Sequence, residues 1–207
     1  MQSVRLLPLI SLFGLLSCSS AANEKTIERT LDASALQQLV LEVGVGQVNL
    51  HSSDSDQLEI TVKLRGERRW WFFSHKVGDV ELQPEQRNGE LRLSIPKDNT
   101  HQQWQLRIPA HLSVQTDLGV GQVYLHQWRN PLQVDVGVGQ INGSLNSSQY
   151  QQIELAVGVG NVGLSNANGS MQSERHLVGG TLNWSGSGQA VLKANLGVGD
   201  ISLSHQP

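Results

Sequence analysis

Two aspartates in this chain of 207 residues have the type and spacing of a paired carboxylate site. Asp117 and Asp135 each lie four residues before a glycine, Gly121 and Gly139, in two copies of one repeated segment. If the copies lie on neighbouring strands, the carboxylates are about 4.8 Å apart and repel each other unless a cation, water or a base relieves them. The pair is a weak candidate for a cation site, or for an acid/base pair like that of β-helix polysaccharide enzymes. Because no third ligand is apparent, we favour two solvated surface carboxylates.

Two histidines also occupy matching places, five residues after a glycine of the repeat: His51 and His126. No metal-ligand spacing of His, Cys or Asp surrounds them, so we expect solvated surface histidines. The glycines Gly44 and Gly46 are not followed by Lys-Ser or Lys-Thr, which argues against a phosphate-binding loop. A Gly-x-Ser-x-Gly segment is absent from the sequence. We therefore expect no cofactor, no resident metal and no catalytic residue, and hence a protein that is not an enzyme.

An aromatic insertion, Arg-Arg-Trp-Trp-Phe-Phe at residues 68–73, is the least regular stretch of the chain. Four consecutive aromatic side chains cannot all point inward from one strand, so we expect at least two to be exposed or to lie in a loop. One interpretation is a tip that contacts a partner or a membrane interface, because Trp and Arg favour both settings. The other is a cap over the end of the core. The candidate contact residues are Arg69, Trp70, Trp71, Phe72 and Phe73.

Copies of a Val-Gly-Val-Gly segment form the elements that position these residues. In the first copy the apolar residues before the turn have odd numbers, up to Val43 and Val45, and those after it have even numbers, from Val48. Alternate residues of a strand face opposite sides, so the chain must bend or bulge by one residue at the second glycine. Glycine suits such a corner because it accepts positive φ. The predicted corner glycines are Gly46, Gly121, Gly139, Gly160 and Gly199.

The spacing of the copies predicts the architecture. From Gly121 onward the second glycines recur at intervals of 18, 21, 20 and 19 residues, if a weaker copy at Gly180 is included. We predict an all-β fold, a single-stranded β-solenoid with rungs of about 20 residues. Alternating apolar residues over 58–114, with a turn at Asn88-Gly89, predict antiparallel, sandwich-like strands before it. Inside the solenoid we expect one aliphatic ladder, made by Val120, Val138, Val159 and Val198.

The N-terminal segment predicts export. Residues 1–17 carry one early charge and a short apolar run, which is typical of a signal peptide. The run ends in Leu-Leu-Ser before Cys18, the only cysteine, and this pattern resembles a bacterial lipobox in which the cysteine is lipidated and becomes the mature N-terminus. By resemblance to Gram-negative lipoproteins, the following Ser19 implies the outer membrane. Residues 18–35 are then a lipidated cysteine with a polar tether, and residues 36–207 one β domain.

The arrangement of residues 39–48, the strand at 58–62, the strand-proline element at 106–109 and the later glycine-centred rungs resembles the bacterial putative-adhesin family of envelope proteins. Domains of that family are described as toast-rack-like, and they share no catalytic residues. We therefore expect a non-enzymatic, lipid-anchored cell-envelope protein, an adhesin-like binding module that acts through a repetitive β surface, on the periplasmic face of the outer membrane or on the cell surface.

The expected partners are the membrane, through the N-terminal lipid, and a protein or glycan that the sequence does not identify. The net charge of −3 gives no reason to expect nucleic acid. Two alternatives stay open. One is a structural or envelope-stress-related scaffold, and the less favoured one is a saccharide-acting β-helix enzyme.

Overall fold

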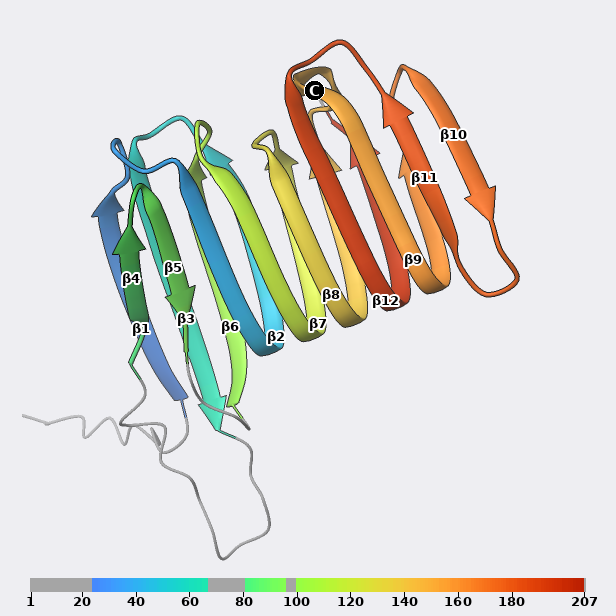
Figure 1. Ribbon diagram of the computed structural model, residues 1–207. Helices are drawn as coiled ribbons and strands as arrows, with labels where there is room; N and C mark the ends of the chain where they lie inside the picture. Colours follow the sequence, from blue (N-terminus) through green and yellow to red (C-terminus); the bar gives the residue numbers. More distant parts are fainter. Residues whose placement is uncertain (1–23, 67–80, 96–99, 207) are drawn as a thin grey trace, which may run out of the picture.

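The computed structural model describes residues 24–66, 81–95 and 100–206 of the chain (Figure 1). Regular structure in these ranges is almost all β, which confirms the predicted class. One turn of 3-10 helix, Ser147–Gln149, joins two strands. Within the described ranges, no helix has the length and apolar character needed to cross a membrane. The strands are β1 (Glu24–Asp32), β2 (Gln38–Ser53), β3 (Gln57–Gly66), β4 (Gln83–Arg87), β5 (Glu90–Ser94), β6 (Thr100–Pro109), β7 (Ser113–Trp128), β8 (Leu132–Leu145), β9 (Tyr150–Ser165), β10 (Ser170–Arg175), β11 (Gly180–Ser185) and β12 (Ala190–His205).

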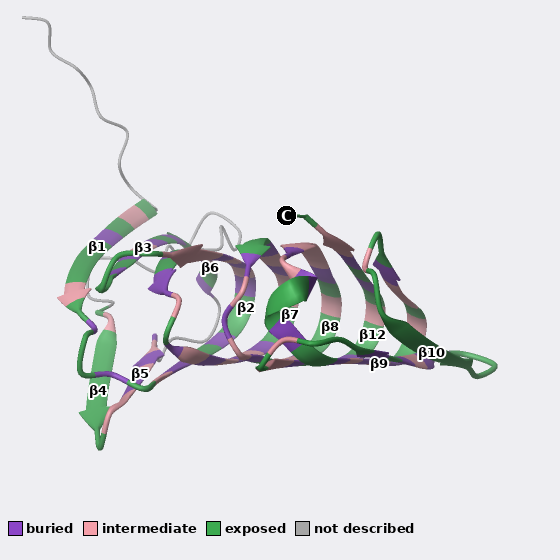
Figure 2. Ribbon diagram, turned by 90° about the horizontal axis from the view of Figure 1, so that it is seen from above, coloured by how far each residue is buried: buried purple, intermediate pink, exposed green. Residues whose placement is uncertain are grey.

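One mixed sheet of 12 strands contains them all, in the order β1-β3-β6-β2-β7-β8-β12-β9-β11-β10, with β5 paired to β2 and β4. The strands β2, β7, β8, β12 and β9 are parallel neighbours, and their repeats are in register. Each of these long strands turns back midway, at the lower edge of the molecule in Figure 1. Its two halves therefore lie in two facing layers, and the apolar core lies between the layers (Figure 2).

The order of the rungs corrects the predicted solenoid. Copies that follow one another in the chain do not all stack on one another, because β12 lies between β8 and β9 and is parallel to both. The weak copy at Gly180 is not a corner. It begins β11, which pairs antiparallel with the first half of β9. The repeats have nearly the same cross-section, so several stacking orders satisfy the same pattern of apolar residues.

The N-terminal part of the fold is antiparallel, as predicted, except that β2 is parallel to both β5 and β6. β1 pairs with β3, β3 with β6, and β4 with β5 across the Asn88-Gly89 turn, where both residues have positive φ. β1 itself, Glu24–Asp32, lies in the stretch that we assigned to a polar tether, so that assignment is wrong for these residues. Its apolar side chains are few, but Ile27 is buried and the whole strand pairs with β3.

The valine between the two glycines of each copy lies outside the core. Val43 and Val48 are buried, whereas Val45 between them is 45% exposed. The predicted ladder inside the core is wrong for the matching valines, which are 46–48% exposed: Val120, Val138, Val159 and Val198. At the apex of a bend the side chain points to the convex side, and the change of face spans the Gly-Val-Gly triplet instead of following it. We call the row Val45, Val120, Val138, Val198 and Val159, in sheet order, the valine ridge.

Residues on either side of the corner form the core in place of those valines. The residues two positions before the ridge are buried, and they are Val43, Leu118, Val136, Leu196 and Val157. Of the residues three positions after it, four are buried: Val48, Val123, Ile141 and Ile201. Burying apolar side chains from both halves of each strand holds the two layers together.

Glycine is required at the corners for two separate reasons. The second glycines have φ between +135° and +158°: Gly46, Gly121, Gly139, Gly160 and Gly199. A Cβ added at Gly139 would also lie 1.7 Å from the carbonyl oxygen of Gly121. The first glycines of the copies form a similar row. A Cβ at Gly137 would lie 2.6 Å from the oxygen of Gly119, but at Gly44, the end of that row, it would meet nothing within 4 Å.

A buried asparagine, Asn130, links the loops at the edge of the fold opposite the corners. Asn130 donates from Nδ2 to the carbonyl oxygens of Pro109 (2.7 Å) and Leu112 (3.0 Å), and its Oδ1 accepts a hydrogen bond from the Ser52 hydroxyl (2.6 Å). The Tyr150 hydroxyl donates to the backbone oxygen of Asn130 at 2.9 Å. Burial raises the pKa of Tyr150, so this phenol stays a donor. The network fixes the loops that connect successive rungs.

Candidate functional site

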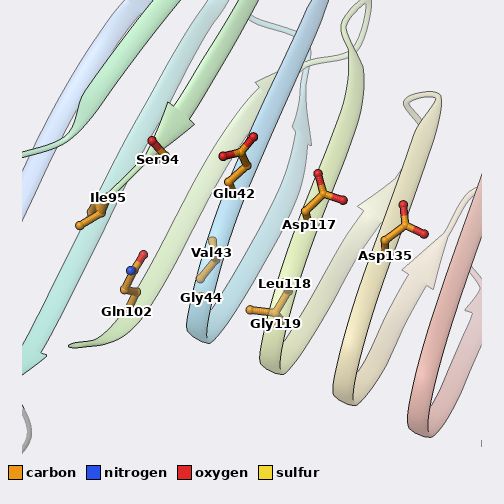
Figure 3. Close-up of a pocket in the computed structure, with 10 residues that line it drawn as sticks. All are labelled: Glu42, Val43, Gly44, Ser94, Ile95, Gln102, Asp117, Leu118, Gly119 and Asp135. Atoms are coloured by element: carbon orange, nitrogen blue, oxygen red, sulfur yellow. The ribbon is translucent and has the colours of Figure 1, made fainter. Parts of the chain in front are cut away.

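A row of polar side chains crosses the outer surface of one layer. Glu42, Asp117, Asp135 and Asn195 are directly paired on β2, β7, β8 and β12. The structure thus places Asp117 and Asp135 side by side, as the sequence predicted. We call these four residues the carboxylate row. Figure 3 shows the carboxylates of Glu42, Asp117 and Asp135 on the same side of the sheet, each on its own strand.

Side-chain amides hold the two aspartates. Gln115 Nε2 donates to Asp117 Oδ2 at 3.2 Å, and Gln133 Nε2 donates to Asp135 Oδ2 at 2.9 Å. Asn195 Nδ2 donates to the other oxygen of Asp135 at 2.8 Å. Each glutamine lies two residues before its aspartate, on the same face of the same strand. Donors therefore fix the carboxylate orientations while both aspartates stay only half-buried.

Glu42 is the third carboxylate of the row, and the sequence analysis missed it. It lies four residues before Gly46, just as Asp117 lies four before Gly121, so superposing the first repeat on the second could have found it. Arg92 on β5 forms ion pairs with Glu42 and with Glu90. The hydrogen bonds to these two carboxylates raise the pKa of Arg92, and the bond to Glu42 has the larger effect. The arginine partly neutralises this end of the row.

A broad, open groove of about 720 Å³ lies against the row. It begins beside β5 and β6 and reaches β8 (Figure 3). Its lining includes Glu42, Ser94, Ile95, Gln102, Asp117 and Asp135. The groove combines carboxylate and amide oxygens with apolar surface, and its oxygens can accept hydrogen bonds from hydroxyl or amide groups of a partner.

The described residues do not form a metal site of the usual kind. Among them, no group of three or more His, Cys, Asp or Glu is arranged to hold a metal ion. Asp117 and Asp135 therefore stay a two-carboxylate pair, and their role as a cation site stays a prediction.

The two histidines at matching repeat positions are stacked. His51 on β2 and His126 on β7 are paired in register, their ring centroids are 4.1 Å apart and their planes differ by 5°. On the other side of β2, His51 is paired with Arg107 of β6. Arg107 forms an ion pair with Glu59, with 3.6 Å between Nε and Oε2. Burial, followed by the charges of His126 and Arg107, lowers the pKa of His51. The matching positions were visible in the repeats, but the contact between the two rings was not predicted.

One copy has Gly-x-Gly-x-x-Gly spacing, at Gly158, Gly160 and Gly163. All three glycines lie within β9, and the next element is the strand β10. Phosphate binding by that motif depends on the N-terminus of a following helix. The spacing in β9 therefore does not indicate a phosphate site. The candidate contact residues 69–73 and Cys18 lie outside the described residues, and their roles stay predictions.

Comparison with known proteins gives a likeness of fold. No family model matches the chain, and no curated protein matches it. A Clostridium sporogenes structure, described as a putative cell adhesion protein, aligns with a TM-score of 0.50 and 17% identity over 88% of this chain and 100% of that one. A putative adhesin from Bacteroides fragilis aligns over 86% of this chain and 97% of that one, with a TM-score of 0.35 and 12% identity. A putative adhesin from Parabacteroides merdae aligns over 61% of this chain and 54% of that one, with a TM-score of 0.29 and 14% identity.

The Clostridium likeness shows that this chain shares a fold with a solved bacterial protein. It covers nearly all of both chains, so it includes the parallel rungs as well as the antiparallel start. At 17% identity it extends to the fold alone.

Proposed function

We propose that this protein is a non-enzymatic, lipid-anchored component of the bacterial cell envelope and acts as an adhesin-like binding module. The observation that carries the proposal is the in-register display of polar side chains on the outside of parallel strands. The row from Glu42 to Asn195 repeats at the strand spacing, about 4.8 Å, and lies beside an open groove. The fold shared with a protein described as a putative cell adhesion protein supports the same reading.

The chemistry of the row suits a partner with many hydrogen-bond donors. Carboxylate oxygens only accept hydrogen bonds, and the neighbouring amides both donate and accept. An extended glycan or a protein segment presents hydroxyl or amide donors at short, regular intervals, so several of them can engage the row together. Each contact is weak on an open surface, and binding strength comes from their number.

Binding is tested with the biotinylated domain on intact bacterial envelopes. Asp117→Asn with Asp135→Asn keeps the shape of the row and removes its two central charges, so we expect at least about tenfold weaker binding. Glu28→Gln with Glu174→Gln makes the same change of charge on exposed residues of β1 and β10 and should bind like the unchanged protein. Equal binding by both double variants would contradict a binding role for the row.

The proposed anchor is the lipidated Cys18, which places the protein in the outer membrane, on its periplasmic face or at the cell surface. Residues 1–17 and the Leu-Leu-Ser before Cys18 support it. Labelling cells with radioactive palmitate should mark the unchanged protein, whereas Cys18→Ala should accumulate as an unlabelled precursor. Persistent labelling of Cys18→Ala would refute the anchor.

A saccharide-acting enzyme is the second candidate, because the Asp117–Asp135 pair does lie beside a groove. Retaining glycosidases place their two carboxyl groups about 5–5.5 Å apart, close to the spacing of neighbouring strands. New reducing ends from envelope polysaccharides, lost in the Asp117→Asn and Asp135→Asn double variant, would favour this candidate. If neither binding nor hydrolysis depends on the pair, the scaffold alternative is preferred.

A further inference from the structure

The valine ridge is a continuous apolar edge. Its five members occupy directly paired positions on β2, β7, β8, β12 and β9, and each is 45–48% exposed. Glycines flank every valine on both sides in the chain, so no neighbouring side chain of the same strand covers it. The ridge therefore follows the bends of the long strands, which form the lower edge of the molecule in Figure 1, and its side chains are half-exposed.

The N-terminus of the described chain leaves the fold at the level of this ridge. The corner glycine Gly46 is paired with Gln102, Gln102 with Leu64, and Leu64 with Lys25. Lys25 is the second residue of β1, so the chain enters the sheet at the height of the corners. Figure 1 shows the start of β1 and the corners of the long strands on the same lower side.

The length of chain before β1 places a lipid near the ridge. Cys18 precedes Glu24 by six residues, which span at most about 20 Å when fully extended. From β1 to β2, the first strand of the ridge, there are three strand spacings, or about 14 Å. A lipid on Cys18 can therefore enter a bilayer that touches the lower edge of the fold.

We propose that the valine ridge docks on the surface of the membrane in which Cys18 is anchored, and so sets the orientation of the domain. This inference rests on the lipid anchor of the proposed function. The lipid holds the domain at a high local concentration at the bilayer, so a small apolar contact suffices to select one orientation.

A bilayer fits the ridge better than a second copy of the chain does. Half-exposed valines contribute roughly 30–60 Å² each, or about 150–300 Å² for the row. A stable protein interface needs about 800 Å² from each partner. A convex edge one residue wide also gives little complementary shape, whereas lipid headgroups and acyl chains move aside to accept it.

The docked orientation leaves the carboxylate row in water. Asp135 lies three residues before Val138, or about 10 Å along the strand, and interfacial apolar groups sink about 5–10 Å into the headgroup region. The row and its groove would then stand at the membrane surface and face sideways, open to a partner in the same compartment. Direct insertion of the row is disfavoured, because its carboxylates would lose their hydration.

The test uses lipidated protein in vesicles of phosphatidylethanolamine with a minor fraction of phosphatidylglycerol. Lipidation blocks the only native cysteine, so Val138→Cys accepts a single environment-sensitive fluorophore, and Gln149→Cys, at the opposite edge, is the matched control. We expect blue-shifted emission at position 138 and severalfold stronger quenching by lipid-attached quenchers than at position 149. Adding Val120→Ser and Val198→Ser should bring the signal at position 138 to the level of the control.

Equal, water-like signals at positions 138 and 149 would overturn the docking proposal. A blue shift at 138 that lipid quenchers do not reduce, and that grows with protein concentration, would mean a second copy covers the ridge and would overturn it too. To separate this from failure of the anchor, the same labels are read in Cys18→Ser protein held by an N-terminal histidine tag on nickel-chelating lipids. Absence of palmitate on Cys18 would refute the anchor. Docking of the ridge would then be judged only from the signals at positions 138 and 149 in the tagged protein.

Discussion

Gly44→Ala and Gly137→Ala make the same chemical change at equivalent places of two repeats. Neither glycine has positive φ, so alanine is allowed by the backbone at both positions. The difference between them is steric. At Gly137 the new Cβ would lie 2.6 Å from the Gly119 carbonyl oxygen of the neighbouring strand, and at Gly44 it would meet nothing within 4 Å.

The magnitude follows from these distances. A carbon and a carbonyl oxygen in ordinary contact need about 3.3–3.6 Å, so Gly137→Ala must move two paired strands apart by roughly 0.7–1 Å. Overpacking of this kind typically costs about 1–3 kcal/mol. At Gly44 the loss of freedom in the unfolded chain should stabilise the protein by about 0.4–1 kcal/mol. Gly137→Ala has the same effect on the unfolded chain, so the two variants should differ by the steric cost alone, roughly 1–3 kcal/mol.

Urea unfolding followed by circular dichroism measures this difference, with melting temperature as a second readout. For a domain of this size, 1 kcal/mol corresponds to about 2–4 °C, so the two melting temperatures should be separated by roughly 2–12 °C. Gly44→Ala should melt at or above the temperature of the unchanged protein. If the two variants have the same stability, the close approach of the backbones at the corners is not what requires glycine there, and the steric reasoning is refuted.

Three further predictions test the core, the stacked histidine and the Asn130 network by urea unfolding. Val136→Asp should cost more than about 3 kcal/mol because it buries an unpaired carboxylate, whereas Val138→Asp, on the exposed ridge, should cost under about 1 kcal/mol; equal costs would contradict the corner geometry. The pKa of His51 is lowered in the folded protein, so the unfolded chain binds the proton first as the pH falls. Stability should thus decrease below about pH 6.5, and less so in His51→Gln, with His101→Gln as the exposed control; identical pH profiles for all three would refute the assignment. Asn130→Ala should cost about 2–4 kcal/mol, because it leaves buried carbonyl oxygens without a donor, and a change under about 0.5 kcal/mol would show that water replaces the amide.

The repeats predicted that each long strand has a corner at the glycines, but they did not predict which residues form its apex. A one-residue change of face between Val43 and Val48 can occur at several places, and the sequence pattern is the same for each. We placed it after Val45, which put that valine inside. The chain instead makes the whole Gly-Val-Gly triplet the apex, because two rows of glycine backbone then approach closely and the valine takes the convex side.

The neighbours of each rung were predictable only where the connection is short. Asp117 and Asp135 are on consecutive strands, β7 and β8, with residues 129–131 between them, so their pairing followed from the spacing. Glu42 is 75 positions before Asp117, and the sequence pattern does not indicate that β2 is the neighbour of β7. The same distance separates His51 from His126, which is why matching positions could be predicted but not the stacking of the rings.

The place of β12 between β8 and β9 has a consequence for the order of folding. Residues 190–205 come last in the chain, yet they supply the pairing partner of two strands made earlier. Until they are present, β8 and β9 each expose an unpaired parallel edge, and these edges could pair directly in a compact but incorrect sheet. The native order of the rungs is therefore complete only when β12 has inserted between two strands that precede it in the chain. Folding that depends on such non-local pairing is slow, so we expect the insertion of β12 to be a late step.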